Sequence, residues 1–351
     1  MPHRSHNELL PRPDRVRLGV FLSLALNAAG LWVLAYILPS RGRILETLRS
    51  LSRPHLLVAL VLVVISWYCD ARRFQALAAA YRHRLPVPAA LQGVLAGNFL
   101  INVTPFYLGA GLAHILVLRR HGGSWSQSAA TVAGGGIIAN AVQLAVALSA
   151  VAVGHRHLSP ALLRLPLLYP VLGAYTLVFA GMLLALNRVV DLETRLARYI
   201  AHRYWGGLAR MGVELTRGWG NLRSQHSRAL LVTITWSLLY FLSFHSVAYV
   251  LWRGLGVQLS WASVMMLQII IFILFSIVPT PGGSGALEVG AFALLTTVAA
   301  PELVGAFIVL WRSLTFYLNL VVGWVAMTGV LAGGLARVGA GKEETLDPVP
   351  N

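Results

Sequence analysis

Long stretches without a charged side chain alternate along the chain with short blocks rich in arginine. Runs free of Asp, Glu, Lys and Arg, apart from Arg156 in the fourth, cover residues 18–40, 54–69, 85–118, 121–163, 165–187, 229–252, 254–287 and 313–336. An α-helix needs about 20 apolar residues to cross the hydrocarbon core of a bilayer, and most of these runs are long enough. The pattern therefore predicts an all-α, polytopic helical membrane protein. The run 54–69 is short and would rely on Arg72 and Arg73 reaching the interface.

Two of the runs, 85–118 and 254–287, are interrupted near their middle by proline and glycine. The first contains Thr104-Pro105-Phe106-Tyr107-Leu108-Gly109-Ala110-Gly111, and the second contains Val278-Pro279-Thr280-Pro281-Gly282-Gly283-Ser284-Gly285. A shift of 174 residues superposes Pro105 on Pro279, Gly109 on Gly283 and Gly111 on Gly285. The pattern favours an internal duplication in which each half reads span, span, broken hairpin, span.

The broken hairpins set the relative orientation of the two halves. A hairpin enters and leaves on the same side of the membrane whether it is re-entrant or crosses twice, so each half has an odd number of crossings. We therefore expect two inverted repeats, at residues 18–163 and 165–334, whose discontinuous helices meet near the bilayer midplane as in many transporters. Residues 1–17 and 335–351 are expected to be cytoplasmic tails.

Composition and charge agree with this class. Hydrophobic residues make up 57% of the chain and charged residues only 11%, against about 25% in soluble domains. With the N-terminus inside, 20 of the 28 basic residues fall in predicted cytoplasmic segments and 7 in outer ones, although the four arginines at 41–53 oppose the trend. This bias predicts a multi-pass plasma (inner) membrane protein with both termini cytoplasmic, and favours it over nucleic-acid binding.

Residues 188–228 form a basic linker within the second repeat. Apolar side chains recur there every four residues, at Leu192, Leu196, Ile200, Tyr204 and Leu208, and most arginines fall on the opposite side of a helix. Such a helix would lie flat at the cytoplasmic interface and attract anionic lipid. An ordinary helical connector explains the same pattern equally well.

The second broken hairpin is a candidate binding site. In hydrocarbon every backbone N–H and C=O needs a partner, so irregular backbone survives only where protein or water lines it. Prolines remove donors and glycines permit positive φ, so the segment 279–285 cannot be a continuous helix. A helix that starts just after it would direct unpaired N–H groups inward, where a lipid phosphate could bind. The alternative is a Pro-Gly turn between two spans at the membrane surface.

Two charged residues, Glu288 and Arg312, fall inside apolar segments. A charge at the bilayer centre costs about 3 kcal/mol or more, so each should face the interior and have a partner. The two could pair as a clamp between the hairpin and the last span. They could also serve transport, with Arg312 binding a phosphate and Glu288 holding a cationic head group or a proton. The equivalent of Glu288 in the first half is His114, which can titrate near neutrality.

Other polar residues occur within the predicted spans. They are Asn98, Asn102, Asn140, Gln143, His245, Gln268 and Asn319. Interhelical hydrogen bonding is the expected role of most of them. No HExxH, P-loop or GxSxG motif occurs in the sequence, and its embedded carboxylates are too few for a metal site. We therefore expect a protein that is not an enzyme and that needs no metal or other cofactor.

The segment 279–288, PTPGGSGALE, followed by Arg312, resembles the lysylphosphatidylglycerol synthase transmembrane family, whose members are also called flippase-like membrane proteins. The first half is similar to a weaker motif of that family at Arg73-Phe74, Gly97-Asn98-Phe99, Pro105, Gly109 and Gly111. The resemblance implies transbilayer movement of a phospholipid or another lipid-linked anion, with any synthesis left to a partner. Ala110 and the glycines at 134–136 depart from many members, which argues against lysyl-lipid as the cargo.

These observations predict a flippase-like transporter that moves an anionic phospholipid or a lipid-linked intermediate between leaflets. The expected substrate-binding residues are Arg312, Glu288, Gly282, Gly283, Ser284, Gly285, Pro279, Pro281, Asn98, Asn102, Pro105, Gly109, Gly111 and His114. The alternative is a non-catalytic membrane subunit that docks an aminoacyl-lipid, glycolipid or hopanoid biosynthetic enzyme through the 188–228 helix. Membrane lipids are the expected partners in both cases.

Overall fold

The computed structural model of the 351-residue chain describes most of the predicted spans. The described residues are 46–49, 51–81, 83–105, 109–154, 169–181, 183–184, 227–276 and 278–343, with single positions at 21, 25 and 28. The N-terminal tail, nearly all of the predicted first span and the linker 188–228 up to residue 226 lie outside this part of the chain.

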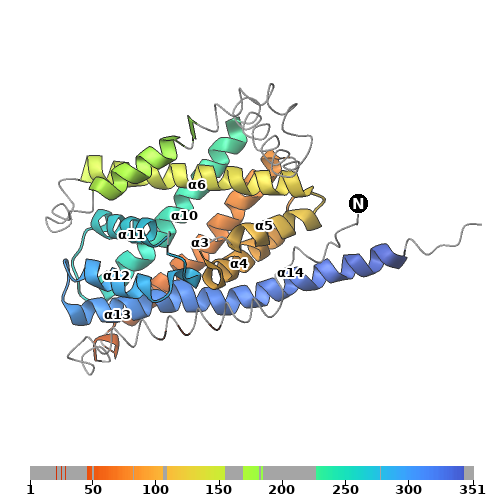
Figure 1. The fold of residues 1–351 in the computed structure, drawn as a ribbon. Helices are drawn as coiled ribbons and strands as arrows, with labels where there is room; N and C mark the ends of the chain where they lie inside the picture. Colours follow the sequence, from red (N-terminus) through yellow and green to blue (C-terminus); the bar gives the residue numbers. More distant parts are fainter. Residues whose placement is uncertain are drawn as a thin grey trace, which may run out of the picture.

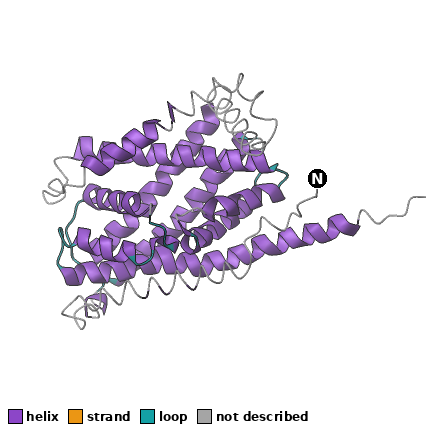
Figure 2. Ribbon diagram, in the orientation of Figure 1, coloured by secondary structure: helices purple, strands orange, loops and turns teal. Residues whose placement is uncertain are grey.

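Every regular element in the described residues is a helix (Figure 1 and Figure 2). In chain order the elements are α3 (Arg53–Ala80), α4 (Val87–Val103), α5 (Gly109–Arg120), α6 (Trp125–Gly154), α10 (Ser227–Gly254), α11 (Trp261–Ser276), the 3₁₀ turn η3 (Pro281–Gly283), α12 (Ala286–Leu295), α13 (Pro301–Arg312), the π-helical turn η4 (Ser313–Tyr317) and α14 (Leu318–Glu343). A further apolar helix covers Tyr169–Gly181. The predicted all-α class is confirmed.

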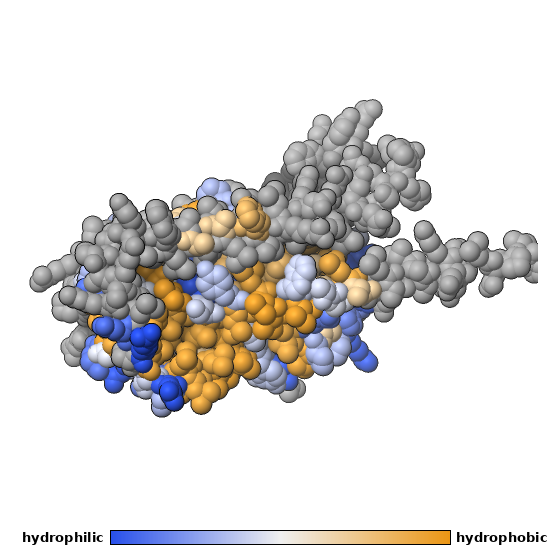
Figure 3. Space-filling view, turned by 90° about the horizontal axis from the view of Figure 1, so that it is seen from below, coloured by the Kyte–Doolittle hydropathy of each residue, from blue (hydrophilic) through white to orange (hydrophobic). Residues whose placement is uncertain are grey.

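Four helical segments are long and apolar enough to cross a membrane. They are Arg53–Ala79, Gln127–Ala152, Ala229–Gly254 and Pro301–Ala332. Large apolar side chains also point outward, and Leu57, Leu231 and Val325 are each more than half exposed. Figure 3 shows such side chains gathered in a broad apolar area on one face of the molecule. Helices that are apolar on their outer as well as their inner sides belong in lipid, so the predicted polytopic helical membrane protein is confirmed.

Two helices extend well beyond the uncharged runs that predicted them. α3 continues past residue 69 to Ala80, and the last long helix begins at Pro301 rather than at residue 313. In α3 the Arg73 Nη2 atom lies 2.6 Å from Asp70 Oδ1, so these charges are paired one helical turn apart. Counting uncharged residues therefore underestimated both helices, because paired charges do not end a membrane helix.

α3 and α10 pack against each other more extensively than any other pair of described helices (Figure 1). Small polar residues are buried on both, including Ser66 on α3 and Ser237 on α10. Each hydroxyl donates to a carbonyl of its own helix, that of Ser66 to Val63 and that of Ser237 to Thr233, both at 2.7 Å. Small side chains that satisfy their own polar groups allow membrane helices to approach closely.

The order of the helices recurs along the chain with nearly constant spacing. α3 and α10 each have 28 residues and begin 174 residues apart. α4 and α11 also begin 174 residues apart, and α6 and α13 begin 176 apart. This spacing supports the internal duplication inferred from the proline and glycine motifs. The inverted relation of the two halves stays a prediction.

The first broken segment lies between α4 and α5. The Thr104 hydroxyl donates to the Leu100 carbonyl at 2.7 Å and accepts the Gly109 N–H at 2.9 Å. A Cβ atom on Gly109 would lie 2.5 Å from the Leu100 carbonyl oxygen, which is too close for any other residue. Residues 106–108 lie outside the described chain. The break is thus closed by hydrogen bonds within the hairpin, as irregular backbone in a membrane protein requires.

The second broken segment lies between α11 and α12. Gly282, Gly283 and Gly285 have φ values of 59°, 66° and 83°, a region that favours glycine. A Cβ atom on Gly282 would lie 3.0 Å from the Asn102 carbonyl oxygen and 2.8 Å from the Phe316 ring. Asn102 is near the end of α4, just before the first break. The two broken segments therefore meet inside the helical bundle.

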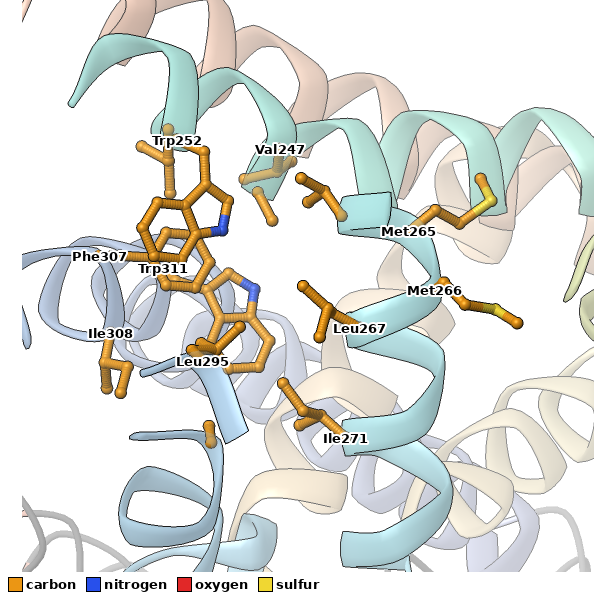
Figure 4. Close-up of a cluster of buried hydrophobic side chains, with 14 of the residues drawn as sticks. Val247, Trp252, Met265, Met266, Leu267, Ile271, Leu295, Phe307, Ile308 and Trp311 are labelled. Atoms are coloured by element: carbon orange, nitrogen blue, oxygen red, sulfur yellow. The ribbon is translucent and has the colours of Figure 1, made fainter. Parts of the chain in front are cut away.

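A stack of aromatic side chains positions α13 against α10 (Figure 4). The Trp252 and Phe307 ring centroids are 4.1 Å apart with an interplanar angle of 11°, and Phe307 stacks on Trp311 at 6.0 Å. α11 contributes Leu267 and Ile271 to the same buried cluster. Because Trp311 directly precedes Arg312, this stack also fixes where the guanidinium group lies.

Replacing Gly282 with alanine should destabilise the protein. The left-handed backbone conformation costs a non-glycine residue roughly 1–2 kcal/mol, and the added methyl group would also overlap Phe316 and the Asn102 carbonyl. We expect Gly282→Ala to lower the midpoint of thermal unfolding in detergent. Gly136→Ala is the matched control, because no neighbouring atom lies within 4 Å of its added Cβ. Equal midpoints for the two variants would contradict the contact at Gly282.

Candidate functional site

Glu288 lies in the first turn of α12 and is fully buried. Its Oε2 atom accepts a hydrogen bond from the Gly285 N–H at 2.6 Å. A carboxylate near a helix N-terminus is stabilised by the local N–H groups and by the helix dipole. The half-helix start that the sequence offered to an external anion is therefore occupied here by a carboxylate of the same helix.

Arg312 ends α13 and lies against Glu288. Its Nε atom is 2.6 Å from Glu288 Oε1, and its side chain is 5% exposed. The π-helical turn that follows places the Phe316 ring 4.0 Å from the guanidinium carbon, a cation–π contact. The pair expected from the sequence thus forms, and it ties the second hairpin to the last long helix. Removing either partner would leave an uncompensated buried charge.

A cavity of about 440 Å³ opens beside this ion pair. Its lining comes from α4, α6, Tyr169–Gly181, α10, α11, the second break, α12, α13 and the segment after it. The lining residues are Asn98, Ile101, Asn102, Asn140, Gln143, Tyr175, Tyr240, Phe241, Phe244, His245, Phe272, Ile273, Gly282, Leu287, Trp311, Arg312, Thr315 and Asn319. Among the described lining residues Arg312 therefore carries the positive charge, and most of the others are amide or aromatic.

Asn319 organises the polar side of the cavity. Its Oδ1 atom accepts hydrogen bonds from Trp67 Nε1 at 2.9 Å and from Asn98 Nδ2 at 3.4 Å. Its Nδ2 atom donates to the Thr315 carbonyl at 2.6 Å, within the π-helical turn and the start of α14. A single amide therefore joins α3, α4 and the last long helix, which makes the relative position of these cavity walls specific.

A second polar pair lies where α6 and the helix Tyr169–Gly181 line the cavity. The Tyr175 hydroxyl donates to Asn140 Oδ1 at 2.6 Å, and Asn140 Nδ2 donates to the Gly136 carbonyl at 2.8 Å. On α10, His245 is 2% exposed and its ring is stacked on Phe241, with centroids 6.1 Å apart. Gln268 is its polar neighbour, and neither ring nitrogen of His245 makes a hydrogen bond of normal geometry to a described residue. The cavity thus combines satisfied amides with unsatisfied polar atoms.

The structure separates the predicted site residues into groups. Four line the cavity: Arg312, Gly282, Asn98 and Asn102. Others lie in the breaks or behind the lining: Glu288, Pro281, Gly283, Ser284, Gly285, Gly109 and Gly111. The prolines that open the motifs, Pro105 and Pro279, are exposed. Glu288 in particular does not contact the cavity, so its charge faces Arg312 and the α12 N-terminus rather than a ligand.

His114 lies apart from the cavity, between α3, α4 and α5. Its ring is 4.4 Å from that of Phe74, and a Cβ atom on Gly97 would lie 3.3 Å from its Nε2 atom. The Asp70–Arg73 pair is nearby on α3, where the Arg73 guanidinium also lies 5.4 Å from the Tyr240 ring. The first half therefore has its own partly buried charge pair, on a span rather than on its hairpin.

Several lining residues were not assigned to the site from the sequence. Gln143, Asn140, His245 and Asn319 were recognised only as polar residues in spans, and their convergence depends on helix packing. Tyr175, Tyr240 and Thr315 carried no signal, because tyrosine and threonine are common in membrane helices. Among the described residues no group of three His, Cys, Asp or Glu side chains could hold a metal ion.

The buried pair should show strong coupling in a double-mutant cycle. Glu288→Gln or Arg312→Gln alone leaves the partner charge buried and unpaired, so each should lose about 3–5 kcal/mol of unfolding free energy. The double variant removes both charges and should lose much less than the sum. Equilibrium unfolding by SDS in mixed micelles measures all four proteins. A double variant as unstable as the two losses added together would show that the groups do not interact.

Comparison with known proteins agrees with this architecture. No curated protein matches the chain. A family model described as the lysylphosphatidylglycerol synthase TM region matches residues 15–323, which covers both broken segments, Glu288 and Arg312. The chain therefore belongs to this family, and it is a membrane protein tied to lipid metabolism or transport.

Proposed function

We propose that this protein moves an anionic phospholipid or another lipid-linked anion between the leaflets of the plasma membrane, and that it is a transporter rather than an enzyme. The observation that carries the proposal is a buried guanidinium, that of Arg312, on the wall of a cavity of about 440 Å³ whose mainly apolar lining also presents amide side chains. This cavity lies within a helical bundle that presents a broad apolar area on one face (Figure 3). A lipid head group needs such a compartment, while its acyl chains stay in the surrounding hydrocarbon.

Arg312 is suited to hold a phosphate. A guanidinium group presents five N–H donors in a planar fork that matches two phosphate oxygens, and it stays charged when buried. The Arg312 Nε atom lies 2.6 Å from Glu288 Oε1, so the guanidinium already has a counter-ion inside the protein. The carboxylate compensates the guanidinium while no anion is bound, and a phosphate entering the cavity would share or replace it. In this scheme Glu288 is a counter-ion and not a head-group ligand.

The broken hairpins supply the means of movement in this proposal. Gly282 lies on the cavity wall and against the end of α4, so the contact between the two breaks borders the binding compartment. In transporters with inverted repeats, discontinuous helices at such a contact rock against each other and open the site to one side at a time. The predicted inverted duplication, with both termini in the cytoplasm, would give the protein this property.

Leaflet exchange in proteoliposomes tests the proposal. The full-length protein is reconstituted with fluorescent, acyl-labelled phosphatidylglycerol, and dithionite quenches the label in the outer leaflet, with and without an imposed proton gradient. We expect the protein to accelerate exchange over protein-free vesicles. Ile101→Trp should slow exchange several-fold, because Ile101 lines the cavity and the larger side chain would fill part of it.

The matched control is Val64→Trp, at a half-exposed position on the outer face of α3. It adds a tryptophan of the same size outside the cavity and should leave exchange unchanged. The proposal fails if the unaltered protein does not accelerate exchange under either condition. It also fails if Ile101→Trp is as active as Val64→Trp, since the cavity would then not be the route.

A further inference from the structure

We infer that the head group carried in the cavity is uncharged and rich in hydroxyl groups, such as glycerol, another polyol or a sugar attached to the lipid phosphate. This inference rests on the proposed function and names the substrate class of the same site. It follows from the charge of the cavity wall, from the kinds of polar side chains on it, and from the hydrogen-bonding atoms that the protein leaves unpaired.

The wall has no described group to pair with a cationic head group. Among the described lining residues Arg312 is the charged one, and no Asp or Glu is present. Glu288 is fully buried behind Arg312, and Asp70 pairs with Arg73 on α3. The aromatic face of Tyr240 already has the Arg73 guanidinium 5.4 Å from its centroid. An ammonium group would therefore lose its hydration and meet the Arg312 guanidinium without a free carboxylate.

Amide side chains on the wall suit hydroxyl groups. Asn, Gln and hydroxyl groups can each donate and accept hydrogen bonds. Amide side chains can therefore bind the hydroxyl groups of a polyol both as donors and as acceptors. Gln143 makes no hydrogen bond to any described residue, although it lines the cavity. Asn98 donates through Nδ2 to Asn319, which leaves its Oδ1 atom as an acceptor. Asn98 and Gln143 come from α4 and α6, so they present amides from different helices.

Two buried polar side chains on the wall point to a ligand more directly. His245 is 2% exposed; Gln268 is its polar neighbour, and neither ring nitrogen makes a hydrogen bond of normal geometry to a described residue. The indole N–H of Trp311, which Figure 4 labels, is also buried and has no partner within the described part of the chain. A neutral imidazole has one donor and one acceptor, and an indole has one donor. Because leaving such atoms unpaired destabilises the protein, hydroxyl groups of a bound head group are suitable partners for them.

Comparing head groups on one phosphate backbone tests the inference. The full-length protein is reconstituted with acyl-labelled phosphatidylglycerol, phosphatidylinositol, phosphatidylethanol or lysylphosphatidylglycerol. Phosphatidylethanol has the same phosphodiester charge as phosphatidylglycerol but no head-group hydroxyl. We expect phosphatidylglycerol and phosphatidylinositol to exchange at least about tenfold faster than the other two lipids, because each unmade hydrogen bond reduces binding several-fold.

Variants connect this preference to the cavity wall. His245→Phe and Gln143→Leu should each lower the ratio of the phosphatidylglycerol rate to the phosphatidylethanol rate. Two positions are used because either substitution alone could impair folding. Gln92→Leu removes the same amide from α4 outside the cavity, where Gln92 faces the Ala326 carbonyl, and should leave the ratio unchanged.

The possible outcomes separate the inference from the proposed function. Acceleration of all four lipids to the same extent would overturn the inference and leave lipid transport standing. Faster exchange of lysylphosphatidylglycerol than of phosphatidylglycerol would also overturn it, because a cationic head group would then be preferred. Acceleration of none of the lipids would overturn the proposed function itself.

Discussion

The ion pair between Glu288 and Arg312 is the interaction on which the rest of the site depends. Neither charge could stay buried alone in an apolar bundle, because the desolvation of an isolated ion costs several kcal/mol. Glu288 faces two positive partners, the N-terminus of α12 through Gly285 and the guanidinium of Arg312. This arrangement allows a helix to start within the bundle and an arginine to lie at a cavity wall. The second hairpin and the last long helix are held together at the same point.

The Glu288–Arg312 pair can form only because the backbone around it is irregular. Positive φ at Gly282 and Gly285 turns the chain so that α12 starts facing Arg312. Because Gly282 has no side chain, the end of α4 can pack against it. After Arg312 the π-helical turn brings Phe316 under the guanidinium. Regular helices would place these groups on separate surfaces. The breaks therefore create the site, while the long spans such as α3 and α10 provide the frame that holds it.

The charge distribution of the cavity follows from where the carboxylate lies. Since Glu288 is behind Arg312, the wall presents a cation, amides and aromatic rings, and no described carboxylate. In the proposed function, such a wall binds a phosphate and forms hydrogen bonds with neutral groups attached to it. The sequence allowed Glu288 to bind a cationic head group, but its full burial and its contact with Gly285 give it a role inside the protein. Family membership is consistent with a lipid ligand but does not specify its head group, which we infer from the residues that line the cavity.

The amino-acid sequence by itself determined the all-α membrane class, the approximate place of the described spans, the two broken segments and the candidate pair of Glu288 and Arg312. These features are local, because they depend on apolar length, on proline and glycine, and on the cost of a charge in an apolar run. Only the tertiary structure decided that Glu288 turns away from the cavity, and that Gln143 and His245 reach it while His114 does not. Such placements depend on how distant helices rotate and pack against each other, and the spacing of residues along one helix does not contain that information.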